Sequence, residues 1–238
     1  MIISQKTPFK RGFTLAESVI ALGILVVLIT GFLAVFGPAA TAIRKTLSGE
    51  DASRMQATLE VEMSVLREGR ESQIYDSPFE KAFTWISRSH ERGGSVFLYN
   101  YRADLTQVRS DGSYGAREDV SGVAGQDYLI QPMARRLDDP LLEEDFEALE
   151  GRVFFVKMTQ LVFGPGGLRV SDKIGEIVDP HDVGSDFTNN VKEFPESTIL
   201  FEAEFYRLPT RSFNYVTGAF DPLEFTRPVF RRNMGVSR

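Results

Sequence analysis

The polarity pattern of the chain begins with a long apolar stretch. Residues 18–43 are 26 consecutive residues without a charged side chain. About 20 helical residues cross the hydrocarbon core of a bilayer, so this stretch predicts a transmembrane helix. Glu17 lies at the start of the stretch, where a charge inside hydrocarbon costs about 2.5–3.5 kcal/mol. A carboxylate at this position therefore needs an explanation.

Helical periodicity continues beyond the apolar stretch. Apolar residues recur along one stripe of a helix that extends over residues 44–70: Leu47, Ala52, Met55, Leu59, Met63 and Leu66. Asp51 and Glu62 interrupt this stripe, which predicts incomplete burial at both positions. We expect the extension to pack on a soluble domain over residues 71–238.

A second helix is predicted around residues 78–92. Ser77 is the expected N-cap, Pro78 occupies the first turn, Glu80 completes a capping box, and glycines at 93 and 94 stop the helix. Three large residues form its apolar face: Phe79, Phe83 and Ile86. His90, near the C-terminal end, is interpreted as a surface residue that the helix dipole favours, in preference to a metal ligand.

After this helix the pattern changes to an alternation of apolar and polar residues. Strands are predicted over residues 96–101, 127–133, 152–163 and 198–208, with a further edge strand over 223–231. In the fourth strand Phe201, Ala203 and Phe205 face inward while Glu202 and Glu204 face outward. Strands that follow one another with few helices between them favour an antiparallel sheet. The predicted fold class is α+β, with a long N-terminal helix, membrane-spanning in its first half, packed on this sheet.

Three segments between the strands are irregular. Residues 109–126 contain four glycines and predict a loop. Seven acids and no base occur between Asp138 and Glu150, and we interpret them as the solvated face of a short helix that buries Leu142, Phe146 and Leu149. Residues 171–197 form a long loop that contains Asp179, Asp182 and Asp186, and the sequence leaves open whether these oxygen ligands bind calcium.

Composition and charge narrow the classes of function. The first twelve residues hold three basic residues and no acid, so the remaining 24 basic and 33 acidic residues give a net charge of −9. A body this acidic is not expected to bind nucleic acid. The C-terminus alone is basic, with Arg231, Arg232 and two further arginines beside Phe225 and Phe230. A nucleic-acid-binding tip is therefore a third, weaker hypothesis.

The sequence contains no recognisable catalytic or cofactor site. It has no cysteine and only two histidines, His90 and His181, which argues against a thiolate or histidine metal centre. It also has no G-x-S-x-G, H-E-x-x-H or phosphate-binding loop motif. We predict no catalytic residue, no cofactor and no metal ligand, and hence no enzymatic activity.

The N-terminal segment "KRGFTLAE", residues 10–17, resembles the processing motif of type IV prepilins and type II secretion pseudopilins. That motif is a basic leader ending in glycine, then Phe-Thr-Leu-x-Glu, then a long apolar stretch. Here Lys10 and Arg11 precede Gly12, Phe13 follows it, and Glu17 is the fifth residue after the cleavage point. The resemblance covers roughly residues 6–45 and does not extend to the domain beyond.

The resemblance implies a maturation pathway. A membrane prepilin peptidase would cleave between Gly12 and Phe13, remove the cytoplasmic leader of residues 1–12, and methylate the new amine of Phe13. The transmembrane helix would then occupy residues 13–43. Glu17 would pair with the N-terminal amine of a neighbouring subunit and act as an assembly determinant. The alternative for Glu17 is that it reaches the lipid headgroups.

The resulting prediction is a structural minor pilin or pseudopilin of a type IV pilus or a type II secretion pseudopilus. It would cross the bacterial inner membrane once, with a cytoplasmic N-terminus and a periplasmic or extracellular domain. Its expected partners are the prepilin peptidase, related subunits, the inner-membrane assembly platform and membrane lipid. The alternative is an extracytoplasmic binding module or enzyme with an uncleaved anchor; a cleaved secretory signal is a further reading.

Overall fold

The computed structural model describes residues 14–184 and 189–238 of the 238-residue chain. The chain divides into two compact units, Met1–Leu47 and Ser48–Arg238. The first helix, α1 (Leu15–Ser64), contributes to both units. The protein is of the α+β class, with an N-terminal apolar helix and an antiparallel sheet, as the sequence predicted.

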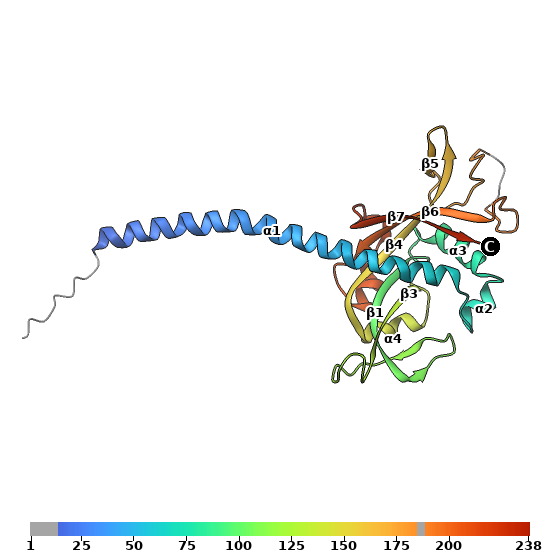
Figure 1. Cartoon of the computed structure of the whole chain (residues 1–238), viewed down its shortest axis with the longest axis horizontal. Coiled ribbons are helices and arrows are strands. Elements are labelled where there is room, and N and C mark those ends of the chain that lie inside the picture. The colour runs from blue at the N-terminus through green and yellow to red at the C-terminus, as the bar shows by residue number, and fades with distance from the viewer. Residues whose placement is uncertain (1–13, 185–188) are drawn as a thin grey trace, which may run out of the picture. The chain divides into compact units, whose positions relative to one another are not determined.

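The C-terminal unit is built on one antiparallel sheet whose strands differ in length (Figure 1). Its central path is β2 (Tyr114–Ala116), β1 (Val96–Val108), β4 (Leu149–Gly164), β6 (Thr198–Arg207) and β7 (Phe230–Ser237). β3 (Leu129–Arg136) pairs with β1, and β5 (Gly167–Val170) pairs with β4. Every strand pair is antiparallel, which matches the short connections and the alternating pattern of the sequence.

One face of the sheet is covered by the last turns of α1 and by α3 (Pro78–Arg88). The predicted stripe is buried here from Ala52 to Met63, with Ala52, Leu59 and Met63 fully enclosed. They pack in one core with inward side chains of β1, β4 and β6, among them the predicted Phe201, Ala203 and Phe205. Leu66, beyond the end of α1, is partly buried, and the side chain of Leu47 lies outside the described residues. Burial of this apolar stripe stabilises a helix whose propensity alone would not hold it.

The other face of the sheet has its own core. Alternate residues of β1, including Phe97, Tyr99 and Tyr101, pack against α4 (Leu141–Glu147) and the segment around Phe220. That segment contains a short π-helix, Tyr215–Ala219, and a 3-10 helix, Pro222–Glu224. Because β1 and β4 are covered on both faces, their burial is nearly continuous and not alternating.

α3 begins as its sequence predicts. The Ser77 hydroxyl oxygen accepts a hydrogen bond from the Glu80 N–H at 3.2 Å, and Pro78 occupies the first turn. The Glu80 carboxylate accepts from the Asp76 N–H at 2.8 Å, one residue earlier than a capping box requires. After the helix the backbone passes so close to the Arg88 carbonyl that a Cβ at Gly94 would lie 2.2 Å from its oxygen.

Several predicted boundaries differ from the structure. α1 ends at Ser64, short of residue 70; the chain then turns at Gly69, with a φ of 85°, and a separate helix α2 (Arg70–Ile74) begins. β7 begins at Phe230, so the strand predicted over 223–231 was placed too early; it is an edge strand, as expected. The predicted loop over 109–126 contains the short strand β2.

Candidate functional site

The predicted processing site is at the start of the chain. Gly12 and Phe13 lie outside the residues that the structure describes, so the predicted cleavage and methylation positions have no structural account. The description begins at Thr14, directly before α1. Of the predicted site, Glu17 is therefore the residue whose surroundings can be examined.

Glu17 caps the helix in which it lies. Its Oε2 accepts hydrogen bonds from the backbone N–H and from the hydroxyl of Thr14, both at 2.9 Å. The Thr14 hydroxyl oxygen accepts in turn from the Glu17 N–H at 3.2 Å. This reciprocal pair is a capping box, and the Thr-x-x-Glu spacing in the sequence carries its signal. Our sequence interpretation of Glu17 missed this local role.

The apolar stretch after Glu17 has the dimensions of a membrane span. Leu15–Ala34 has a mean hydropathy of 2.3, and within the described part of the chain it is the one helix long and apolar enough to cross a membrane. Twenty helical residues extend about 30 Å, the thickness of the hydrocarbon core. The hydroxyl of Thr30 donates to the Val26 carbonyl at 2.8 Å, so this polar group is satisfied within the helix.

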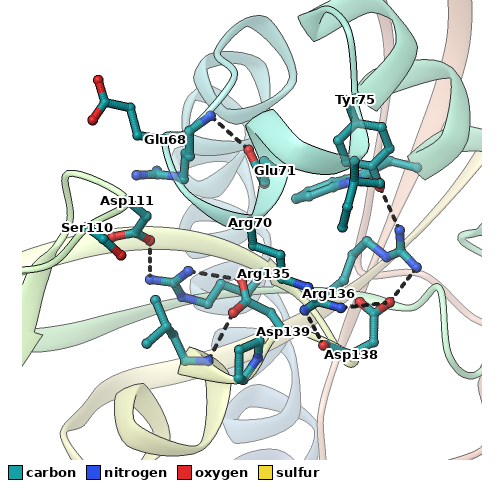
Figure 2. A pocket seen from close by; sticks show the side chains of 15 residues that line it. Glu68, Arg70, Glu71, Tyr75, Ser110, Asp111, Arg135, Arg136, Asp138 and Asp139 are labelled. Carbon is teal, nitrogen blue, oxygen red and sulfur yellow. Dashed lines mark hydrogen bonds and ion pairs between the residues drawn. The ribbon is translucent and has the colours of Figure 1, made fainter.

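A second candidate site is a pocket of about 200 Å³ in the C-terminal unit (Figure 2). It lies between the α1–α2 connection, α2, α3, the turn after β1, the end of β3 and the start of α4. Its lining combines apolar side chains with many charged ones: Arg67, Glu68, Arg70, Glu71, Ile74, Tyr75, Trp85, Ser110, Asp111, Arg135, Arg136, Asp138, Asp139, Pro140 and Leu141. Sequence reasoning did not bring these residues together.

One side of the pocket is held by a buried ion-pair cluster around Lys81. The Lys81 ammonium is fully buried and lies 2.5 Å from a Glu62 oxygen and 2.7 Å from a Glu71 oxygen. It also donates to the Val65 carbonyl at 3.1 Å, which satisfies a carbonyl beyond the end of α1. Arg67 turns back to bind Glu62 through three hydrogen bonds of 2.6–3.0 Å.

These contacts correct our expectation of Glu62. Its residue exposure is only 2%, so burial of the α1 stripe is complete here and not interrupted. Burial alone would raise the pKa of Glu62, but the Arg67 hydrogen bonds and the charges of Lys81 and Arg67 outweigh it and hold the pKa below its usual value. Asp51, the other interrupting residue, is partly exposed and pairs with Arg152.

The opposite side of the pocket is held by Arg135, which is almost completely buried. Its guanidinium binds three carboxylates, those of Asp145 at 2.7 Å and of Asp111 and Asp139 at 3.0 Å. Asp145 also accepts from the Tyr99 hydroxyl at 2.7 Å. Burial, together with the charge of Asp145, raises the pKa of the Tyr99 hydroxyl well above its usual value.

The interpretation of the acidic segment as a solvated face is therefore wrong for part of it. Leu142, Phe146 and Leu149 are buried as predicted, but Asp145 is completely buried as well. A second guanidinium, that of Arg109, reaches Asp145 at 2.7 Å from the turn after β1. An acid that follows a buried leucine by three residues on a short helix lies on the same face, which was the available signal.

Between these two clusters Arg136 and Arg70 meet at one carboxylate (Figure 2). Arg136 donates to the Tyr75 hydroxyl oxygen and to an Asp138 carboxylate oxygen, both at 2.9 Å. Arg70 lies 3.8 Å from the same carboxylate oxygen and also donates to the Asp138 backbone carbonyl. Two guanidinium groups that converge on one point are suited to binding a negatively charged group. The ion pairs of Lys81 and Arg135 on either side fix the surrounding elements.

The two histidines and the aspartate-rich loop hold no visible metal site. His90 is half-buried, and its Nε2 lies 3.0 Å from the Thr159 hydroxyl and 3.2 Å from the Met158 carbonyl, so it anchors the end of α3 to β4 instead of standing at the surface. Burial lowers its pKa, with the charge of Lys157 adding to the effect. In the described ranges, 14–184 and 189–238, no group of three or more His, Cys, Asp or Glu could hold a metal ion. Of the candidate calcium ligands Asp179, Asp182 and Asp186, the last falls outside these ranges.

Two arginines of the basic C-terminus, Arg231 and Arg238, are engaged within their own domain. Arg231 pairs with Glu204 at 2.6 Å, and Arg238 donates to the carbonyls of Val191 and Phe194 at 2.9 and 3.0 Å. The ring of Phe230 packs on Phe205, with centroids 5.5 Å apart. Phe225 belongs to the aromatic cluster of the second core. Both rings thus already have partners inside the fold.

Comparisons of the chain with protein-family models, with curated proteins and with solved structures gave no match.

Proposed function

We propose that this protein is a structural minor pilin or pseudopilin that is processed by a prepilin peptidase and assembled into a type IV pilus or a type II secretion pseudopilus. The observation that carries the proposal is a coincidence of two features. The segment with the Lys-Arg-Gly-Phe-Thr-Leu-x-Glu pattern ends at the first turn of α1, and α1 continues directly as a helix of membrane-spanning length. The α+β domain with its antiparallel sheet is compatible with this class of protein.

In this proposal Glu17 has two successive partners. Before assembly its carboxylate caps α1 through Thr14. After cleavage, the new amine of Phe13 in a neighbouring subunit offers a cation, and a charge pair enclosed by apolar helices specifies register more than it adds stability. The capping interaction holds the carboxylate at the start of the helix, where such a neighbour would meet it.

The proposal is tested by the N-terminal residue and intact mass of the protein isolated from its native membrane. We expect a chain that begins at Phe13 and carries one added methyl group. A chain that retains residues 1–12, or that begins after residue 42, would refute the proposal. The first result would favour the anchored binding module or enzyme, and the second a secreted domain.

The role of Glu17 is tested by two matched variants. Glu17→Gln retains an amide oxygen that can accept from Thr14 but carries no charge, whereas Glu17→Asp retains the charge on a shorter side chain. If the charge specifies assembly, Glu17→Gln should abolish incorporation into filaments while membrane insertion and processing continue. Normal incorporation of Glu17→Gln would show that helix capping is the whole role of this residue.

A further inference from the structure

The pocket contains a corner in which cations outnumber anions. Arg70 and Arg136 both direct a guanidinium nitrogen at Asp138, at 3.8 and 2.9 Å, and the remaining side-chain contact of Arg136 is to the neutral Tyr75 hydroxyl. Of the other cations nearby, Lys81 and Arg135 each have at least two carboxylates, and Arg67 has the carboxylate of Glu62. Arg70 and Arg136 therefore share a single carboxylate, so this corner has one positive charge more than it has negative charges.

Arg136 also has an unused donor. Its side chain is only 9% exposed, yet its Nε has no hydrogen-bond partner among the residues described. Buried polar groups are satisfied in the great majority of cases, so Arg136 is an incompletely satisfied cation on the lining of the pocket. The side chain of Asp138 is 44% exposed, so this corner is open to solvent on the side of that carboxylate.

The wall next to this corner is apolar. Tyr75 and Trp85 are buried, whereas Ile74 is 55% exposed at the rim. A cavity of about 150 Å³ accommodates a benzene molecule, so a pocket of about 200 Å³ has room for one aromatic or branched aliphatic side chain. It is smaller than the roughly 300–1,000 Å³ of sites for whole small molecules. The rest of such a ligand would remain outside, as with an anchor residue of a larger partner.

We propose that this pocket binds a polypeptide segment in which an apolar side chain is directly followed by a carboxylate. The apolar side chain fills the space beside Ile74, Tyr75 and Trp85, and the carboxylate pairs with Arg70 and Arg136. The carboxylate is either the end of a chain or an acidic side chain. Glu68 is exposed at the rim and has no ion-pair partner among the described residues, so it disfavours further negative charge on the ligand. This inference goes beyond the proposed function and stands on the Ser48–Arg238 unit alone.

The chain contains a built-in reporter of the pocket, because Trp85 is its only tryptophan. The full-length protein in detergent micelles would be titrated with N-acetyl-phenylalanine while tryptophan emission is recorded. Three probes separate the contributions: N-acetyl-phenylalanine amide lacks the carboxylate, N-acetyl-alanine lacks the ring, and N-acetyl-Phe-Asp-amide carries the carboxylate on a side chain. Saturable change with the acid, at least about tenfold weaker for the amide and for the alanine probe, is expected.

Two variants make the assignment specific to the corner. Arg70→Gln alters a side chain that is 47% exposed, and Arg169→Gln alters a matched side chain, 44% exposed, on β5 outside the pocket. The first should weaken binding at least about tenfold, and the second should leave it unchanged. Binding of N-acetyl-Phe-Asp-amide without binding of N-acetyl-phenylalanine would support the proposal with an acidic side chain as the carboxylate source.

Three outcomes would overturn the proposal. They are the absence of a saturable change with either carboxylate probe, equal affinity for the acid and the amide, and equal affinity of Arg70→Gln and the unaltered chain. Equal binding of N-acetyl-alanine would likewise reduce the site to one for anions without an apolar anchor. None of these results bears on cleavage at Gly12, so failure of this proposal and failure of the proposed function are distinguishable.

Discussion

Replacing Lys81 with methionine would remove the charge at the centre of the cluster that joins α1, α2 and α3. The substitution preserves an unbranched side chain of similar length, so it creates little cavity. It leaves Glu62 and Glu71 without the ammonium that lies 2.5 and 2.7 Å from them, and it leaves the Val65 carbonyl without its donor. Breaking a buried ion pair by removing one partner costs about 3–5 kcal/mol.

The lower end of this range applies here, because Glu62 keeps its hydrogen bonds to Arg67. A loss of about 3 kcal/mol, with a urea dependence of about 2 kcal/mol per molar, corresponds to a fall of about 1.5 M in the urea midpoint. The assay is equilibrium unfolding of the full-length chain in detergent, followed by tryptophan emission. Trp85 reports directly, since the Lys81 ammonium lies 4.7 Å from its ring centroid.

Two controls test whether the loss of stability comes from the buried cluster. Lys173→Met removes an exposed lysine and should change the free energy of unfolding by less than about 0.5 kcal/mol. Glu71→Gln keeps an acceptor for the Arg67 N–H, so a double-mutant cycle with Lys81→Met should yield a coupling energy of at least about 1 kcal/mol. A loss below about 1 kcal/mol in Lys81→Met, or additive effects in the cycle, would refute the argument that this cluster is a coupled structural unit.

Three further predictions follow from single contacts. Gly94→Ala should cost about 1–3 kcal/mol because its Cβ would collide with the Arg88 carbonyl, whereas Gly93→Ala, with nothing within 4 Å, should be nearly neutral; equal urea midpoints would contradict this. The lowered pKa of Glu62 means that the unfolded chain binds its proton first on acidification, so stability should fall from about pH 4.3 downward. In the Glu62→Gln variant the urea midpoint should no longer show the part of the fall on acidification that Glu62 causes. A pH dependence equal to that of the unaltered chain would contradict this assignment. An NMR titration should give His90 a pKa below the usual value of about 6.5, and a higher pKa would be inconsistent with its burial.

Local signals in the sequence are sufficient to predict a structural feature when one side chain interacts with its near neighbours or packs into an apolar core. The N-cap at Ser77 and the inward set of Phe201, Ala203 and Phe205 follow from spacing of two to four residues, and the structure contains them. The capping box of Thr14 and Glu17 carried the same kind of signal.

Such local signals do not predict the candidate pocket, because its residues come from distant parts of the chain. Arg70 meets Asp138, and Arg136 meets Tyr75, across separations of 68 and 61 residues. Sequence periodicity states which face of an element a charge occupies, but not which opposite charge another element brings to it. For this reason the three-residue spacing from Leu142 could place Asp145 on the buried face of α4, but it could not show that Arg109 and Arg135 would pair with it there.

The sequence by itself determined the apolar N-terminal helix, the α+β class, the start of α3 and the positions of four of the strands. These features depend on backbone propensity and on the period of apolar residues, which are local properties of the chain. Only the tertiary structure decided that Lys81, Glu62, Arg135 and Asp145 are buried, and that Arg70 and Arg136 share one carboxylate. Burying a charge is favourable only when a partner stands within a few ångströms, and the packing of distant segments alone supplies that partner.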